Sequence, residues 1–234
     1  MSIPSPLHKW QVTPTEAIAI QKRLAPLVRQ GPLPGPVHLV AGLDVAFSKA
    51  DRLCFAGVVL WNLREQKVLE TRIAVEPLTF PYVPGLLSFR EGPALLAALR
   101  KLRQEPDLLM CDGQGIAHPR RLGIASHLGV LTGLASIGCG KSRLVGTHQE
   151  PLREKGARSL LRDGDEIIGS VLRTRTGVRP LFVSIGHRID LPAAEELVLA
   201  CCTRYRLPEP IRLADQLVAA AKRDSTSNIA VPGN

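Results

Sequence analysis

The spacing of apolar and polar residues along the chain changes several times, and each change predicts the boundary of a helix or strand. Near the N-terminus, Thr13 and Glu16 have the spacing of a capping box with Pro14 at the first helical position, which predicts a helix to about residue 30. Short polar turns then separate three apolar runs, at residues 37–47, 54–62 and 67–76. We expect these runs to form an antiparallel meander of three strands.

The middle of the chain alternates between helical and strand-like patterns. Ser88 and Glu91 repeat the capping-box spacing at the start of a helical pattern that continues to about residue 104. Beyond it, the pattern predicts a buried strand at residues 108–112, a short helix at 121–129 and a fifth strand at 134–138.

The C-terminal part is less regular. Residues 141–162 are basic and irregular, whereas residues 166–174 and 181–185 predict a late hairpin. Two final helices are expected at residues 193–205 and 211–222, followed by a frayed tail.

Three antiparallel strands followed by helix, strand, helix and strand is the order of a ribonuclease H-like fold. We therefore predict an α/β protein with a central mixed five-stranded sheet, three antiparallel strands and then two parallel ones, flanked by helices and extended by C-terminal strands and helices. No Ser/Gly-rich linker divides the chain, so residues 1–234 are interpreted as one domain with a core at about 12–222 and a flexible tail at 223–234.

Composition narrows the functional classes. The 234 residues include 30 Lys and Arg against 21 Asp and Glu, and the net charge of +9 favours a polyanionic partner such as nucleic acid. Aromatic residues make up only 4%, which argues against a surface of stacking platforms for single strands. Five cysteines without CxxC spacing predict reduced, mostly buried thiols. With no signal-peptide pattern and no apolar run of membrane-spanning length, we expect a cytoplasmic protein without a membrane partner.

Two aspartates stand at predicted strands in positions typical of a metal site. Asp44 lies inside the first strand between apolar neighbours, and Asp112 ends the fourth strand before Gly113 and Gly115. In the predicted topology these strands are adjacent, so the two carboxylates would face each other and need a cation or a shared proton. An oxygen-rich site suits Mg²⁺ or Mn²⁺, and no His/Cys spacing in the chain suits zinc. The alternative is that Asp112 only caps a turn.

Longer motifs in the chain resemble those of a known family. They occupy residues 41–47, 81–91, 112–120, 138–142, 184–189 and 212–215. In this order they resemble the conserved blocks of endonuclease V, the deoxyinosine-directed DNA repair nuclease, and the resemblance runs from about Val12 to Ala221.

The resemblance implies a ribonuclease H-like fold and cleavage of a DNA strand that depends on Mg²⁺, with Mn²⁺ as a substitute. The family cuts the second phosphodiester bond 3′ to deoxyinosine and leaves a 3′-hydroxyl. By position, Asp44, Glu91 and Asp112 would be the metal-binding carboxylates. Asp215 stands where some members carry a histidine beside the metal site, so it is a further candidate ligand.

The resemblance also implies residues for recognition and for catalysis at the phosphate. Tyr82 would be the wedge that fills the gap left by an extruded base. His118 and Lys141 would lie near the scissile phosphate as catalytic residues. The wedge and lesion pocket together would comprise Tyr82, Pro84, Gly85, Leu87, Gly113 and Ile124.

Several of these residues also have a purely structural interpretation. Glu91 could be only the capping glutamate of its helix, and Tyr82 an aromatic at the edge of the core. His118 and His187 could each be structural histidines. A solvated basic face, which is also where DNA phosphates could lie, would comprise Arg120, Arg121, Arg153, Lys155 and Arg158.

Three other functions compete with DNA repair. Residues 135–142 fit a loosened phosphate-loop pattern, but the residues after Ser142 predict extended chain instead of the helix that such a loop opens. Some relatives prefer inosine in RNA, so an inosine-specific endoribonuclease is an alternative. A non-catalytic damage-binding protein is disfavoured, because a polyanion would be bound better without three carboxylates. We expect a monomer whose partner is DNA containing deoxyinosine, or RNA containing inosine.

Overall fold

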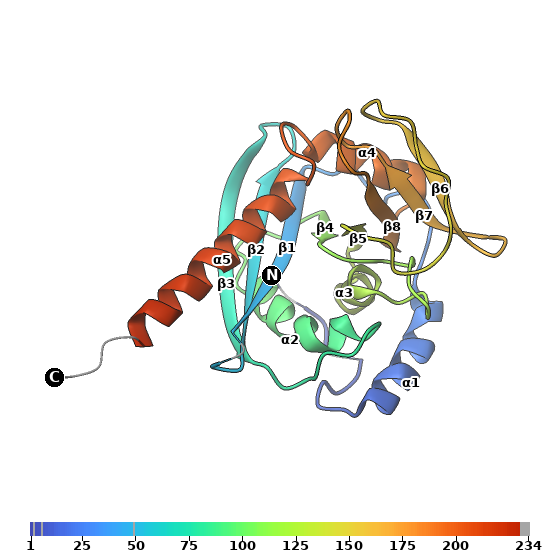
Figure 1. The fold of residues 1–234 in the computed structure, drawn as a ribbon. Helices are drawn as coiled ribbons and strands as arrows, with labels where there is room; N and C mark the ends of the chain where they lie inside the picture. The colour runs from blue at the N-terminus through green and yellow to red at the C-terminus, as the bar shows by residue number, and fades with distance from the viewer. Residues whose placement is uncertain (2, 6, 49, 230–234) are drawn as a thin grey trace.

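The computed structural model describes residues 1–229 apart from residues 2, 6 and 49. Its described strands form one mixed sheet of eight in the order β3-β2-β1-β4-β5-β8-β7-β6 (Figure 1). The first five are β1 Leu39–Ser48, β2 Leu53–Asn62, β3 Lys67–Pro77, β4 Leu108–Cys111 and β5 Ala135–Gly140. The last three are β6 Arg158–Asp163, β7 Glu166–Leu172 and β8 Leu181–His187.

The central part of the sheet has the predicted topology. β1, β2 and β3 form an antiparallel meander, and β4 and β5 run parallel to each other. β1 and β4 are parallel neighbours, with Leu43 opposite Cys111. The predicted adjacency of the first and fourth strands is therefore confirmed, and the α/β class with it.

Helices cover both faces of the sheet (Figure 1). They are α1 Pro14–Leu24, α2 Leu87–Arg100, α3 Ile124–Thr132, α4 Leu191–Cys201 and α5 Glu209–Ile229, with a short 3₁₀ turn at Ala25–Leu27. Because side chains alternate between faces along a strand, Ala41 and Leu43 pack toward α2 and α3, whereas Val40 belongs to the core under α4 and α5.

The first helix begins as its sequence predicts. The Thr13 hydroxyl accepts from the Glu16 amide at 3.3 Å, and the Glu16 carboxylate accepts from the Thr13 amide at 2.7 Å. The predicted end of this helix near residue 30 is wrong. Pro26 has no amide proton to continue the α-helical hydrogen bonds, so the helix gives way to the 3₁₀ turn after Leu24.

The second predicted capping box is also wrong. α2 starts at Leu87, ahead of Ser88, and its N-terminal residue makes no side-chain cap. Glu91 is therefore in the second turn of the helix and does not act as a capping glutamate.

Two further differences concern the C-terminal part. Residues 158–163, predicted to be irregular, form the edge strand β6, which pairs with β7. The predicted tail is helical up to Ile229 as the continuation of α5, and residues 230–234 lie outside the described part of the chain. β7 and β8 are antiparallel neighbours, as the late hairpin predicted.

The cysteines agree with the prediction of reduced thiols. All five are buried and free: Cys54, Cys111, Cys139, Cys201 and Cys202. Within the described residues, no helix has the length and apolar character needed to cross a membrane.

Candidate active site

Asp44 and Asp112 lie on neighbouring strands at the same end of the sheet. Leu43 and Cys111 are opposite each other, and the Asp112 amide donates to the Leu43 carbonyl at 3.3 Å. Gly42 contacts α5 so closely that an added Cβ would lie 2.5 Å from the Pro210 Cβ. Since side chains two residues apart share a face, Asp44 also points toward α5.

The pKa values of the two carboxyl groups are shifted by burial and by neighbouring charges. Burial and the charge of Asp112 raise the pKa of Asp44 to about 7. Burial also raises the pKa of Asp112, and the ion pair with Lys141 opposes this shift. Asp215, an exposed residue of α5, raises the pKa of both. Asp215 is therefore close enough to affect both Asp44 and Asp112, and it is the residue that we predicted as a further candidate metal ligand.

Glu91 approaches the same carboxylates from the opposite helical layer. Its side chain comes from α2 and is buried, with 7% of the residue exposed. Burial raises the pKa of Glu91 well above its usual range, and the charges of Asp44 and Asp112 add to that effect. A buried carboxylate without a hydrogen-bonded partner is costly, so this site favours either a proton or a cation beside Glu91.

Lys141 follows the end of β5 and forms an ion pair with the Oδ2 atom of Asp112. Burial alone would lower the pKa of Lys141, but the contact with Asp112 and the charges of Asp44 and Asp215 raise it. In the described residues, no group of three His, Cys, Asp or Glu side chains is arranged to hold a metal ion. The ion pair with Asp112 is what lets the Lys141 ammonium neutralise part of the negative charge of the site.

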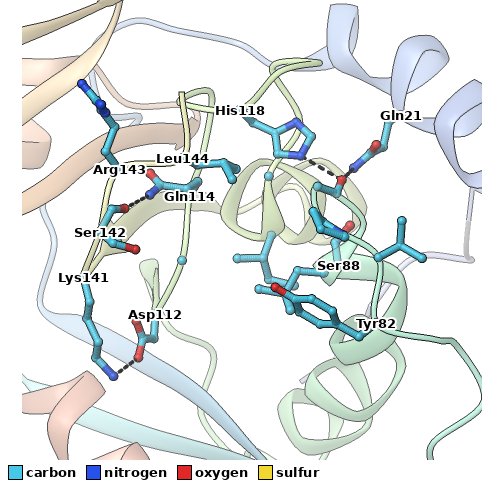
Figure 2. A pocket seen from close by; sticks show the side chains of 18 residues that line it. Gln21, Tyr82, Ser88, Asp112, Gln114, His118, Lys141, Ser142, Arg143 and Leu144 are labelled. Carbon is cyan, nitrogen blue, oxygen red and sulfur yellow. Dashed lines mark hydrogen bonds and ion pairs between the residues drawn. The ribbon is translucent and has the colours of Figure 1, made fainter. Parts of the chain in front are cut away.

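A pocket of about 330 Å³ opens beside Asp112 and Lys141 (Figure 2). Six of its lining residues are the predicted wedge and lesion-pocket residues: Tyr82, Pro84, Gly85, Leu87, Gly113 and Ile124. Asp112, His118 and Lys141 also line it, whereas Asp44, Glu91 and Asp215 do not. Tyr82 is 71% exposed, which argues against the interpretation of this residue as an aromatic at the edge of the core.

The loop that carries Tyr82 is held through one carbonyl group. Gly85 has a φ of +76°, a conformation that glycine adopts without strain. Its carbonyl accepts hydrogen bonds from Gln21 Nε2 at 3.0 Å, His118 Nε2 at 2.9 Å and Arg120 Nη2 at 2.7 Å. Three donors from α1 and from the chain after β4 therefore fix the position of this loop.

His118 contributes to this clamp as a neutral ring. Its Nε2 must donate to the Gly85 carbonyl, and its Nδ1 then accepts from the Arg120 amide at 3.1 Å. Burial, with a smaller effect from the charges of Arg120 and Arg121, lowers the pKa of His118 to about 4. With both ring nitrogens bonded to backbone, the histidine orients the wall of the pocket.

Gln21 is the main residue that sequence reasoning missed. Its Oε1 accepts from Arg120 Nε at 2.5 Å, and its Nε2 also donates to the Leu122 carbonyl at 3.1 Å. Gln21 shares the buried face of α1 with Ala17 and Leu24. A polar residue on that apolar face was the signal that could have identified it. Other unpredicted lining residues are Val83, Ser88, Gln114, Gly123, Gly140, Ser142, Arg143 and Leu144.

Most of the predicted basic face has partners within the protein. Arg121 forms ion pairs with Asp163 and Glu166, both at 2.8 Å, and Arg158 pairs with Glu195 at 3.2 Å. Lys155 donates to the Cys202 carbonyl, and Arg120 belongs to the clamp on Gly85. These residues therefore stabilise the fold more than they form one solvated face.

His187 lies away from the pocket. Its Nδ1 accepts from the Arg29 amide at 3.2 Å, and burial lowers its pKa to about 4, which is the pattern of a structural histidine.

The structure excludes the phosphate-loop interpretation of residues 135–142. β5 ends at Gly140 and the next described regular element is β6, so no helix follows Ser142 to bind a phosphate at its N-terminus.

Comparisons with known proteins point in one direction. The model of the family described as endonuclease V matches residues 22–216. The endonuclease V of Alkalilimnicola ehrlichii is 54% identical over 215 residues, which cover 92% of this chain and 95% of that protein. The endonuclease V of Trichormus variabilis is 50% identical over 213 residues, covering 91% and 96%.

Solved structures of similar chains share the fold. A crystal structure of the endonuclease V of Streptomyces avermitilis has a TM-score of 0.88 and 42% identity, covering 93% of this chain and 96% of that one. The Ciona intestinalis endonuclease V, at 27% identity, has a TM-score of 0.78 and covers 90% and 98%. Its structure is a complex with a 24-mer DNA that contains an inosine followed by a ribo-adenosine.

Proposed function

The chain belongs to the endonuclease V family, and we propose that it recognises deoxyinosine in DNA and hydrolyses the second phosphodiester bond 3′ to that lesion. One observation carries the proposal. Two half-buried aspartates, Asp44 and Asp112, follow paired residues of neighbouring strands, and Asp112 lines a pocket whose wall also carries the exposed Tyr82.

The carboxylates fit a site for Mg²⁺ or Mn²⁺. Asp44, Glu91 and Asp112 offer hard oxygen donors, and mutual repulsion raises the pKa of Asp44 and Glu91, so a cation would relieve it. In the described residues the three do not yet form a closed set of ligands, so the side chains would have to move toward the ion. We propose that these three hold the metal, with Asp215 as a further ligand from α5. When bound, such an ion activates water and stabilises the leaving oxygen of a phosphodiester.

Other residues would position the substrate and stabilise charge. Lys141 lies against Asp112 and would add positive charge where negative charge develops on the phosphate. Tyr82 is exposed in a proline-rich loop and would fill the gap left by an extruded base. At Gly113 an added Cβ would lie 2.6 Å from the Ile124 side chain, so only glycine leaves room for close packing at the pocket floor.

A second candidate is an inosine-specific endoribonuclease. The Ciona intestinalis relative was crystallised with a DNA in which a ribo-adenosine follows the inosine, so a ribonucleotide is accommodated 3′ to the lesion in that protein. The two candidate functions differ only in whether the cleaved strand that contains inosine is DNA or RNA.

Cleavage of matched strands tests both candidates. Purified protein with Mg²⁺ would be incubated with DNA and RNA strands of one sequence, each with inosine or adenosine at one position, and Asp112→Asn would serve as the inactive control. We expect one cut at the second bond 3′ to inosine in DNA and none in the adenosine strands. Faster cleavage of the RNA would favour the endoribonuclease, and equal cleavage of the adenosine strands would refute both.

A further inference from the structure

A second, basic recess adjoins the candidate active site at Lys141. It has a volume of about 380 Å³ and shares Lys141 with the first pocket. Other residues that line it are His148, Arg173, Arg179, Phe182 and Arg206. A strand that leaves the lesion pocket past Lys141 would therefore run into a recess lined by three further cationic side chains, Arg173, Arg179 and Arg206.

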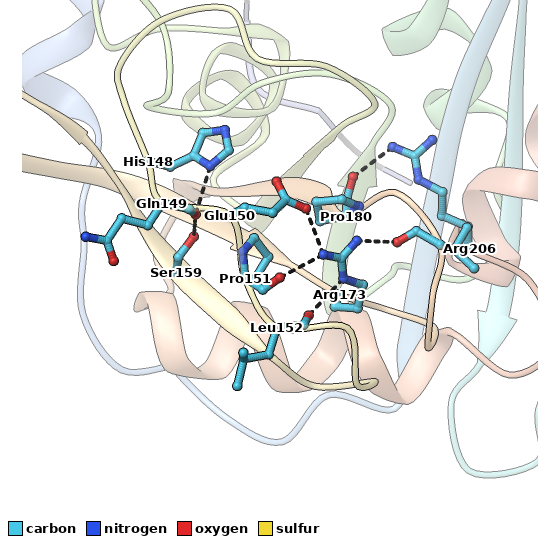
Figure 3. Close-up of polar contacts among 10 residues, drawn as sticks. His148, Gln149, Glu150, Pro151, Leu152, Ser159, Arg173, Pro180 and Arg206 are labelled. Atoms are coloured by element: carbon cyan, nitrogen blue, oxygen red, sulfur yellow. Dashed lines mark hydrogen bonds and ion pairs between the residues drawn. The ribbon is translucent and has the colours of Figure 1, made fainter.

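The buried arginine of this recess is already neutralised (Figure 3). Arg173 is 6% exposed and forms an ion pair with Glu150 at 2.7 Å. Its other hydrogen bonds go to the carbonyls of Pro151, Leu152 and Val178. Arg173 thus stabilises the wall, and Glu150 is the acid that offsets its charge.

The two remaining arginines have no such acid. Arg206 donates to the Pro180 carbonyl at 2.8 Å (Figure 3). It also donates to the Lys141 carbonyl at 3.0 Å, so it holds the chain after β5 against the loop before β8. Arg179 is exposed, and in the described residues neither arginine forms an ion pair. Burial lowers the pKa of Arg206, and the positive charge of the neighbouring Arg179 also lowers it.

We propose that this recess binds a phosphate group of the nucleic-acid strand beyond the scissile bond, through Arg179 and Arg206. The order along the surface supports it: the lesion pocket, then Lys141 with Asp112, then the two arginines. Because the proposed cut is 3′ to the lesion, the recess would hold a phosphate on the 3′ side of the cut. An anion there would offset two neighbouring positive charges. This inference rests on the proposed function for its position along the strand.

Binding measurements in EDTA, where no cleavage is expected, test the recess. Arg179→Gln would be compared with the parent and with Arg175→Gln, a matched control because Arg175 is exposed nearby but does not line the recess. The probes are inosine-containing and undamaged single-stranded DNAs that extend by different lengths 3′ of the inosine position. We expect Arg179→Gln to bind long strands about twofold to fivefold more weakly, the range of one exposed charge pair. Its slope of log affinity against log salt should be smaller by about 0.7.

Single neutral methylphosphonate linkages identify the phosphate. One position 3′ of the cut should weaken binding of the parent and of Arg175→Gln, with no further effect on Arg179→Gln. Equal salt slopes for all three proteins on the long strands, or a methylphosphonate effect that Arg179→Gln retains in full, would overturn the proposal. The undamaged strand separates the two hypotheses: loss of inosine preference contradicts the proposed function, whereas the slope difference on undamaged DNA reports the recess alone.

Discussion

Gln21 of α1 donates a hydrogen bond to the carbonyl of Gly85 at 3.0 Å, across 64 positions of sequence. The same side-chain amide also donates to Leu122 and accepts from Arg120. These contacts fix both ends of the amide, because the nitrogen donates and the oxygen accepts. A helix far from the carboxylates therefore holds the loop on which Tyr82 stands.

Replacing Gln21 should weaken both the fold and lesion binding. Gln21→Ala leaves the Leu122 carbonyl without its side-chain donor in a buried place, so we expect the free energy of unfolding to fall by about 1–3 kcal/mol. Affinity for inosine DNA should fall as the Tyr82 loop loses one of its three anchors. Urea unfolding and a binding titration measure the two effects, with the exposed Gln104→Ala as the control. Parent-like values in both measurements would show that the clamp has no role.

The acidic site should make the metal-free protein less stable at high pH. The folded pKa of Asp44, about 7, lies above the value of an unfolded aspartate, about 3.9. Its contribution is therefore fully present below pH 4 and is lost as the pH rises through about 7. Relative to Asp44→Asn, the parent in EDTA should lose on the order of 2–4 kcal/mol between pH 4 and pH 8.

Urea unfolding at several pH values in EDTA checks this expectation, with Asp165→Asn in an exposed turn as the control. If the parent and Asp44→Asn keep a constant difference across the range, the carboxyl group of Asp44 has an ordinary pKa and the proposed charge cluster is wrong.

Removing either strand carboxylate should stop the chemistry and spare binding. We predict that Asp44→Ala and Asp112→Ala each abolish cleavage, since both aspartates lie at the proposed site of the reaction. Losing a negative charge should not weaken attraction for phosphates, so inosine-DNA binding in EDTA should be largely retained. Single-turnover cleavage and a titration in EDTA separate the two. Near-normal turnover by either variant would contradict the assignment of these residues.

Activity should depend on the divalent cation supplied. We expect cleavage with Mg²⁺ or Mn²⁺, none in EDTA and none with Ca²⁺, because Ca²⁺ prefers more ligands at longer distances. Mg²⁺ should also raise the melting temperature of the parent by relieving repulsion among Asp44, Glu91 and Asp112, and should do so less in Asp44→Asn. Thermal unfolding with and without Mg²⁺ checks this independently of activity. Full cleavage in EDTA would refute the metal requirement.

Tyr82 should affect recognition more than chemistry. Its ring is 71% exposed and lies in the wall of the pocket, with no described contact to the carboxylates. Tyr82→Ala should weaken the inosine complex by about 1–3 kcal/mol, the scale of base–aromatic stacking, and reduce selectivity over undamaged DNA. Titrations of both duplexes at one salt concentration, followed by single-turnover cleavage, measure this. Unchanged affinity and selectivity would exclude the wedge.

Local pattern alone determined the strands β1 to β5 and the α/β class. Alternation of apolar and polar residues and short apolar runs depend only on neighbouring residues, so they can be identified from the sequence without knowledge of the fold. The capping box of Thr13 and Glu16 was identified for the same reason. The identical spacing at Ser88 and Glu91 did not form a capping box, because α2 starts at Leu87 and places Glu91 in its second turn, near the carboxylates of Asp44 and Asp112.

Only the tertiary structure determined the hydrogen bonds on the Gly85 carbonyl and the shifted pKa of Asp44. Gln21 meets Arg120 across 99 positions, and Arg206 meets Lys141 across 65. No local periodicity encodes which polar groups meet over such separations, since that depends on how the layers stack. The pKa of Asp44 is likewise a property of burial and of the neighbouring Asp112, which exist only once β1 and β4 lie side by side.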